Sequence, residues 1–211
     1  MFKKILIIGC GLIGSSILRG SVTKKISKHF FVYEKSKKNI QKIKKINNKI
    51  RILEKLDNKL IDFDFVVLST PMSEYEKIIP NLNKYLNKNC LITDVGSTKE
   101  NILKLKNKKL SKSLDWITSH PISGSEVSGP EYGTKNLFLN KWCVVVNDKN
   151  KIKQNKLLKF WKKLGSKVII MDAKTHDKIF SITSHLPHLI AYNLIKTAQD
   201  FQKKQKKDVI K

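Results

Sequence analysis

Hydrophobic and polar positions alternate in blocks along this chain. Short apolar runs rich in β-branched residues, which predict strands, are separated by stretches whose apolar positions recur at helical spacing. The predicted strands are Lys4–Ile8, His29–Glu34, Ile50–Leu53, Phe63–Leu68, Cys90–Thr93, Asp115–Thr118, Trp142–Val146 and Lys167–Met171. The predicted helices are Leu12–Val22, Lys37–Asn47, Glu74–Leu86, Thr98–Leu105 and Lys151–Leu164. This alternation predicts an α/β fold of the Rossmann type, with a mostly parallel sheet and helices on both faces.

The alternating pattern ends near Ala173. The rest of the chain is helical almost to its end, with Pro187 expected to kink the helix or to separate two helices. The predicted parts are therefore an α/β domain over residues 1–172 and a helical segment over residues 173–211. Because about forty residues are too few for an independent core, the segment is expected to be the start of a helical C-terminal domain.

Lysine dominates the charge of the chain. Its 211 residues include 43 Lys and Arg against 17 Asp and Glu, a net charge of +26, and only Arg19 and Arg51 are arginines. The lysines are spread out with many Asn and Ile, which is typical of an AT-rich coding bias. Neither an aromatic nor an arginine cluster accompanies them. No nucleic-acid partner is expected, although such a positive field favours anionic small molecules.

Cysteine usage indicates a reducing compartment. Cys10, Cys90 and Cys143 form no C-x-x-C pair, are odd in number, and lie in or beside apolar runs. The apolar stretch near the start is too short for the core of a secretory leader, and no run is long enough to span a bilayer. The predicted location is the cytoplasm, with no membrane partner.

A glycine-rich loop follows the first predicted strand. Gly9, Gly11 and Gly14 have the Gly-x-Gly-x-x-Gly spacing of dinucleotide-binding loops. The first glycine makes the turn, the second lets backbone approach the pyrophosphate, and the third packs helix against strand. The loop includes Leu12 and Ile13, and its backbone N–H groups and the positive end of the helix then face the phosphates. Alone, this motif is a weak signal.

Polar residues also follow other predicted strands. The carboxyl ends of parallel strands meet at one edge, where open α/β sheets bind ligands, so these groups are expected to converge. They are the glycine loop, Glu34, Ser69–Pro71, Asp94–Ser97 and His120.

Glu34 stands twenty residues after Gly14, where an acid can accept hydrogen bonds from adenosine ribose hydroxyls and repel a 2′-phosphate. NAD is therefore favoured over NADP. Lys35, Lys37 and Lys38 follow at once and are able to accommodate a phosphate, which keeps NADP as the less favoured cofactor. The alternative interpretation of Glu34 is a solvated strand end.

His120 is the strongest catalytic candidate. It ends a predicted strand before Pro121, and the small residues Ser123–Ser125 leave room for a substrate. A neutral imidazole accepts a proton near neutral pH, although an isolated histidine is more often structural. Ser97, at the end of another strand, is expected to bond a substrate hydroxyl or the imidazole, to cap the next helix, or to do both.

No metal site is predicted. His185 and His188 are three residues apart and share a face if the helix continues through Pro187. No third ligand at suitable spacing completes a site, and Glu126 is too isolated to supply one.

Four segments form a larger pattern, namely Gly9–Ser16, Asp94–Lys99, Ser119–Glu126 and Ser184–His188. In order and spacing they resemble the prephenate/arogenate dehydrogenase family of tyrosine biosynthesis, over essentially the whole chain. The His-Pro-x-x-Gly-x-Glu and His-Leu-Pro-His elements are fairly specific to that family, whereas the glycine loop is generic.

The resemblance implies an NAD(P)-dependent oxidative decarboxylation of prephenate to 4-hydroxyphenylpyruvate, or of arogenate to tyrosine. It implies that His120 accepts the proton of the ring C4 hydroxyl while hydride leaves C4 for the nicotinamide, with Ser97 orienting both groups. The residues implied to form the substrate site are His188, His185, Glu126 and Ser125. Those implied to line the nicotinamide side of the cofactor are Ser69, Thr70 and Pro71.

The sequence departs from the family in one respect. The resemblance implies a longer helical domain that makes the dimer and supplies an arginine to a substrate carboxylate, but no arginine follows Arg51. Lysine is a poor substitute for a bidentate arginine. There are two alternatives. Either the chain is a truncated or shortened version of the family, or lysines and a partner chain bind the substrate carboxylate. NAD binding is expected to survive better than turnover, and a homodimer is expected to be weakened.

Other functions remain in competition with this one. One is a weak or inactive NAD-binding protein of the same family. Another is a different small-acid dehydrogenase or imine reductase, which would not need the two histidines at 185 and 188. Nucleic-acid binding, based on charge alone, is the least favoured.

Overall fold

The computed structural model describes residues 2–205, so the end of the predicted helical segment, 206–211, lies outside the described residues. The chain divides into two compact units, Met1–Ala173 and Lys174–Lys211.

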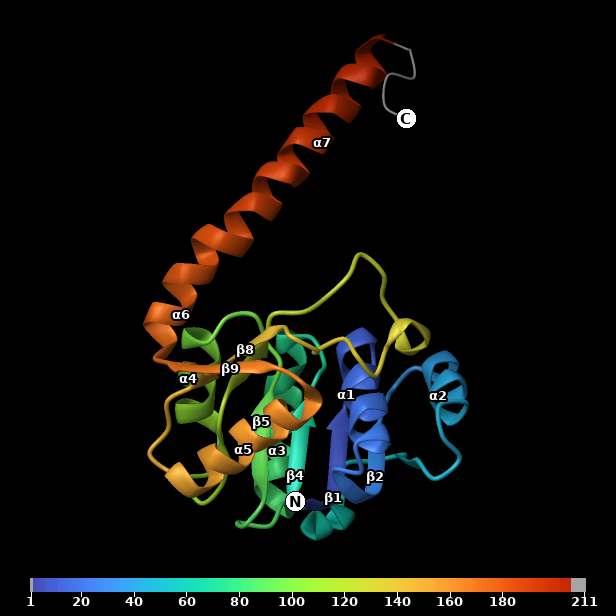
Figure 1. Ribbon diagram of the computed structural model, residues 1–211, viewed down its shortest axis with the longest axis vertical. Coiled ribbons are helices and arrows are strands. Elements are labelled where there is room, and N and C mark those ends of the chain that lie inside the picture. Colours follow the sequence, from blue (N-terminus) through green and yellow to red (C-terminus); the bar gives the residue numbers. More distant parts are fainter. Residues whose placement is uncertain (1, 206–211) are drawn as a thin grey trace. The chain divides into compact units, whose positions relative to one another are not determined.

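Six parallel strands form the main sheet of the first unit, in the order β3-β2-β1-β4-β5-β6 (Figure 1). Their bounds are β1 Phe2–Ile8, β2 Ser27–Tyr33, β3 Arg51–Leu53, β4 Phe65–Leu68, β5 Leu91–Asp94 and β6 Asp115–Trp116. The order reverses direction between β1 and β4, the point at which such sheets bind ligands. The predicted Rossmann-type fold is confirmed.

Helices cover both faces of this sheet. They are α1 Leu12–Thr23, α2 Lys37–Lys44, α3 Tyr75–Tyr85, α4 Glu100–Lys109 and α5 Lys151–Leu164. Alternate strand residues enter two separate cores: Ile5 and Ile7 pack with α1 and α5, whereas Leu6 and Ile8 pack with α3 and α4. All four are fully buried. Burial on both faces explains why the central strands are continuously apolar in sequence.

A second sheet has three strands, β7 antiparallel to β8 and β8 parallel to β9. Their bounds are β7 Ser119–Pro121, β8 Trp142–Val146 and β9 Lys167–Met171.

The position of His120 corrects the predicted strand over Asp115–Thr118. The main-sheet strand β6 ends at Trp116, and His120 lies inside β7 instead of beyond the end of a parallel strand. The chain leaves the main sheet here because the Thr118 carbonyl accepts a hydrogen bond from Val146 N at 3.0 Å. This bond begins the pairing with β8.

The helical pattern of the second unit continues through Pro187. Helix α6 (Ala173–Phe180) is followed by one π turn, Ser181–His185, and by α7, Leu186–Gln205. Pro187 lies in the first turn of α7, directly after the π turn, where proline is tolerated, so it neither breaks the helical path nor separates two helices by a loop. Among residues 2–205, no helix combines the length and apolar content needed to cross a bilayer.

Candidate active site

The glycine loop closes against the segment after β4. Gly9 has a φ of +81°, and a Cβ there would lie 2.5 Å from Cγ2 and 2.8 Å from the backbone N of Thr70. A Cβ on Gly14 would collide with the Gly9 carbonyl oxygen. At Gly11, by contrast, a Cβ would have no atom within 4 Å. Packing within the protein therefore requires the first and third glycines, whereas the second borders open space, as expected where a pyrophosphate approaches backbone.

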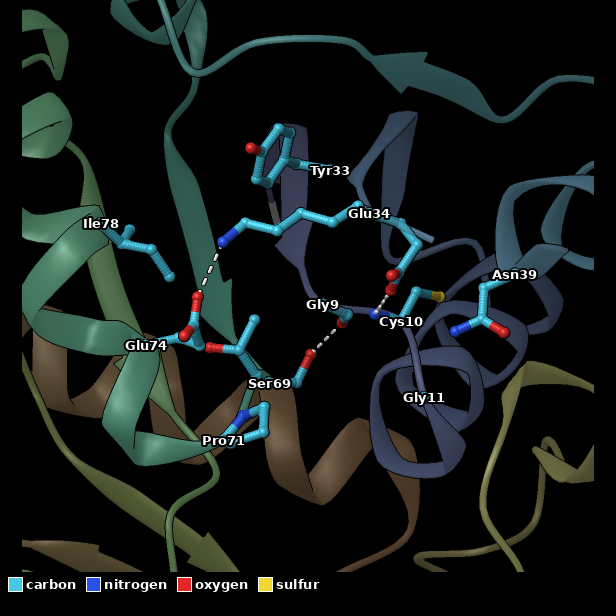
Figure 2. A pocket seen from close by; sticks show the side chains of 12 residues that line it. Gly9, Cys10, Gly11, Tyr33, Glu34, Asn39, Ser69, Pro71, Glu74 and Ile78 are labelled. Carbon is cyan, nitrogen blue, oxygen red and sulfur yellow. Dashed lines mark hydrogen bonds and ion pairs between the residues drawn. The ribbon is translucent and has the colours of Figure 1, made fainter. Parts of the chain in front are cut away.

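A cavity of about 330 Å³ opens beside this loop (Figure 2). The predicted cofactor residues that line it are Gly9, Gly11, Glu34, Ser69, Thr70 and Pro71. Leu12, Ile13 and Gly14 begin α1 and are not among its lining residues. Within the described residues, the buried Oγ1 of Thr70 has no hydrogen-bond partner, so the cavity wall includes a polar atom that a ligand can satisfy.

Glu34 is fixed to the loop beside the cavity. Its Oε2 accepts a hydrogen bond from Cys10 N at 2.9 Å, drawn in Figure 2, and its Oε1 accepts one from Ser36 N at 2.9 Å. Each oxygen keeps a further lone pair for a ribose hydroxyl. Burial and the nearby Glu34 charge raise the pKa of the Cys10 thiol, so Cys10 adds no thiolate beside an anionic pyrophosphate. The open backbone at Gly11, the unpaired Thr70 hydroxyl and this acid fit a dinucleotide.

A buried ion pair lies at the end of β5. Lys99 Nζ is 2.6 Å from Asp94 Oδ2, and both side chains are 0% exposed. The carboxylate also accepts hydrogen bonds from Gly96 N at 2.9 Å and Trp116 Nε1 at 3.1 Å. Lys99 also donates to the carbonyl of Ser119 at 2.8 Å. Buried charges are tolerated only with such additional hydrogen bonds, so this network is a specific structural anchor.

Ser119 joins the two sheets and fixes the backbone next to His120. Its hydroxyl donates to the Asp94 carbonyl at 2.7 Å and accepts from Trp161 Nε1 at 3.1 Å. In β7, Ser119 and Pro121 are buried and His120 is half-buried. Because successive strand residues alternate faces, the imidazole lies on the side away from the Ser119 hydroxyl.

Ser97 is exposed between the two members of the ion pair. The N-cap position of α4 is occupied by Lys99, without a capping hydrogen bond from its side chain, so the interpretation of Ser97 as the helix cap is wrong. Asp94 and Lys99 anchor the backbone on either side of it, and Lys99 bonds the residue before His120. The proposed pairing of Ser97 with His120 stays a prediction.

Sequence reasoning placed Asp94 among the polar residues at the ligand-binding edge but gave neither it nor Lys99 a specific role, although both belong to a segment that carried the family resemblance. The available signal was a carboxylate at the end of an apolar strand with a lysine five residues later. Sequence alone does not show that both are buried.

The remaining candidates, those for the substrate site, are not among the residues that line the cavity. Ser125 and Glu126 are exposed in the loop after β7. His185 ends the π turn, and His188 Nδ1 lies 2.7 Å from the Ser184 carbonyl in the second unit. A carbonyl only accepts, so Nδ1 carries a proton and Nε2 is the acceptor of the neutral ring. The substrate roles of these four residues stay predictions. Among the described residues, no group of three or more His, Cys, Asp or Glu is arranged to hold a metal ion.

Fold and cavity together define a dinucleotide-binding protein. The family is identified by two models: residues 20–170 match the nucleotide-binding domain of prephenate dehydrogenase, and residues 172–211 match its dimerization domain. The chain belongs to the prephenate dehydrogenase family, as the four sequence segments predicted, and thus to a family of oxidoreductases.

Individual relatives agree with this assignment. Cyclohexadienyl dehydrogenase of Zymomonas mobilis is 29% identical over 213 residues, covering 100% of this chain and 72% of that protein. Prephenate dehydrogenase of Lactococcus lactis is 34% identical over 203 residues, covering 95% of this chain but only 55% of that protein. The crystal structure of Aquifex aeolicus prephenate dehydrogenase with hydroxyphenyl propionate and NAD+ superposes with a TM-score of 0.84 at 29% identity. That match covers 93% of this chain and 69% of the other.

Proposed function

We propose that this chain catalyses the NAD+-dependent oxidative decarboxylation of prephenate or arogenate. Membership of the prephenate dehydrogenase family and the similarity to a relative solved with NAD+ support the proposal. The single observation that carries it is the Ser119 network, which fixes the backbone at His120 against the carboxyl end of β5, beside the segment with Ser97.

NAD+ is held by the glycine loop and the cavity beside it. Gly9 and Gly11 provide backbone for the pyrophosphate, Glu34 accepts ribose hydroxyls, and Ser69–Pro71 form the opposite wall. Leu12 begins the helix whose positive end faces the phosphates. When bound, NAD+ supplies the acceptor for hydride from ring carbon C4.

His120 accepts the proton of the C4 hydroxyl as the C4 carbonyl forms. Ser97 orients this hydroxyl. Loss of the ring carboxylate as CO2 leaves its bonding electron pair in the ring, and the resulting phenolate regains a proton from His120. Ser125, Glu126, His185 and His188 contact the rest of the substrate.

The second unit contributes to a homodimer in this proposal, because its residues match the dimerization domain of the family. The cytoplasm is the proposed location. Its support is the three cysteines, all buried and none in a disulfide, which suit a reducing compartment.

Substitution of His120 tests the reaction. His120→Asn should lower prephenate- or arogenate-dependent NADH formation by about 10²- to 10⁴-fold, the usual contribution of a general base, while NAD+ still binds. His29→Asn is the matched control, because His29 is exposed on β2. NADH absorbance gives the rate, and isothermal calorimetry gives the NAD+ affinity.

Two results would contradict the proposal. Full activity of His120→Asn would show that another group accepts the proton. Binding of NAD+ without reduction by either substrate would favour the second candidate, a non-catalytic NAD-binding member of the family.

A further inference from the structure

The cofactor cavity carries an ion pair that the proposed reaction does not use. Lys35 follows Glu34 after β2, and Glu74 precedes α3. Lys35 Nζ donates to Glu74 Oε2 at 2.7 Å, the bond that reaches Glu74 in Figure 2. Both residues line the cavity. The pair therefore links the segments that follow β2 and β4 at the cavity wall.

Glu74 holds its position through a second lysine. Lys77 Nζ donates to the other carboxylate oxygen, Oε1, at 2.6 Å. The hydrogen bond to Glu74 raises the pKa of Lys35, and the bonds from Lys35 and Lys77 lower the pKa of Glu74 to about 2. The pair is thus fully charged at neutral pH, and each lysine has its own carboxylate oxygen.

The position of Lys35 matters for the choice of cofactor. An acid at the end of β2 binds ribose hydroxyls, and a cation nearby accommodates the 2′-phosphate of NADP. Lys35 is the residue next to that acid, and Asn39, another donor, lines the same cavity. Without Glu74, Lys35 would be a ready phosphate ligand beside Glu34. With Glu74 present, the Lys35 ammonium is already bonded to the Glu74 carboxylate, which lies just before α3.

We propose that Glu74 is a specificity-determining residue: by binding Lys35 it withholds this cation from a 2′-phosphate and favours NAD+ over NADP+. The inference rests on the proposed function, in which this cavity binds the dinucleotide. Two carboxylates then act by different means, Glu34 by repelling the phosphate and Glu74 by occupying the cation that would attract it.

The test measures dissociation constants of NAD+ and NADP+ by isothermal calorimetry. Glu74→Gln should shift their ratio toward NADP+ by about two- to fivefold, the size of one solvent-exposed charge pair. Adding Lys35→Met should return the ratio to the wild-type value. Glu76→Gln is the matched control, because Glu76 lies in the first turn of α3, just after Glu74, and pairs with Lys109 outside the cavity.

The outcomes separate this inference from the function on which it rests. An unchanged ratio in Glu74→Gln overturns it, as does a shift that persists without Lys35 or that Glu76→Gln reproduces. If the wild-type chain binds neither dinucleotide, the proposed function itself fails. If NAD+ binds and the ratio stays fixed, only the role of Glu74 fails.

Discussion

The cofactor cavity and the Asp94–Lys99 network belong to the same sheet but hold their polar groups in opposite ways. In the cavity, the Glu34 carboxylate is partly exposed and bonded to two backbone N–H groups, and Thr70 keeps an unpaired hydroxyl. In the network, both charges are fully buried and make hydrogen bonds with the loop after β5, with β6 and with β7. A part of the protein that exchanges a ligand keeps open space and spare lone pairs, whereas a part that fixes the backbone keeps neither.

This difference determines how each region responds to substitution. Removing a charge from the network leaves its partner buried without compensation, so the effect is on stability. Changing the cavity alters groups that water or a ligand can still satisfy, so the effect is on binding. The two regions are best compared by measuring both stability and NAD+ affinity for substitutions in the network and in the cavity.

Lys99→Met should have the largest effect on folding. It leaves the Asp94 carboxylate buried and uncompensated, which costs about 3–5 kcal/mol in the free energy of unfolding. Urea denaturation measures this loss. Lys109→Met is the control, because its ion pair with Glu76, at 3.3 Å, is exposed on both sides and should contribute less than about 1 kcal/mol. Equal losses in the two variants would show that the buried network is no anchor.

Gly9→Ala and Gly11→Ala should show which glycine is required for the packing of the protein and which for binding of the ligand. At Gly9 the positive φ and the contact with Thr70 should cost about 1–3 kcal/mol of stability, with loss of NAD+ binding. At Gly11 a methyl group meets no protein atom, so stability should change by less than about 0.5 kcal/mol. NAD+ affinity should nevertheless fall about tenfold, or about 1.4 kcal/mol, because the methyl group occupies the space where the pyrophosphate approaches.

Thermal denaturation and calorimetry on the same two proteins provide the measurements. A large loss of stability in Gly11→Ala would show that this glycine is required by the fold and not by the ligand. Unchanged NAD+ affinity in that variant would place the pyrophosphate elsewhere.

The cavity was predictable because each of its parts is encoded locally. Short stretches of sequence define each part: the strand before Gly9, the glycine spacing, and the acid at the end of the next strand. The parallel order of the main sheet then brings Glu34 and Ser69–Pro71 to that loop without further information.

The network and the position of His120 depend on pairings between distant segments. Lys99 is buried by its contact with Ser119, and Ser119 is placed by the pairing of β7 with β8, which joins residues 119 and 145. Neither periodicity nor spacing specifies that antiparallel pairing. A lysine in a polar segment is ordinarily solvated, so its burial was not predictable. The π turn before Pro187 is likewise a local response that the sequence pattern does not distinguish from a kink.

Of these changes, protonation of Glu74 should have the smallest effect, and it tests the ion pair at the wall of the cofactor cavity. Its folded-state pKa, about 2, lies below the ordinary value of 4.5, so the ion pair contributes fully above pH 4.5 and is lost as pH falls toward 2. Lys35 lowers this pKa most and Lys77 next. Lys35→Met should therefore raise the pKa of Glu74 more than Lys77→Met does, as measured by NMR titration of the carboxyl carbon. An equal or reversed order would mean that Lys77, in the adjoining helix α3, holds Glu74, and that the contact between the two cavity segments is weak in solution.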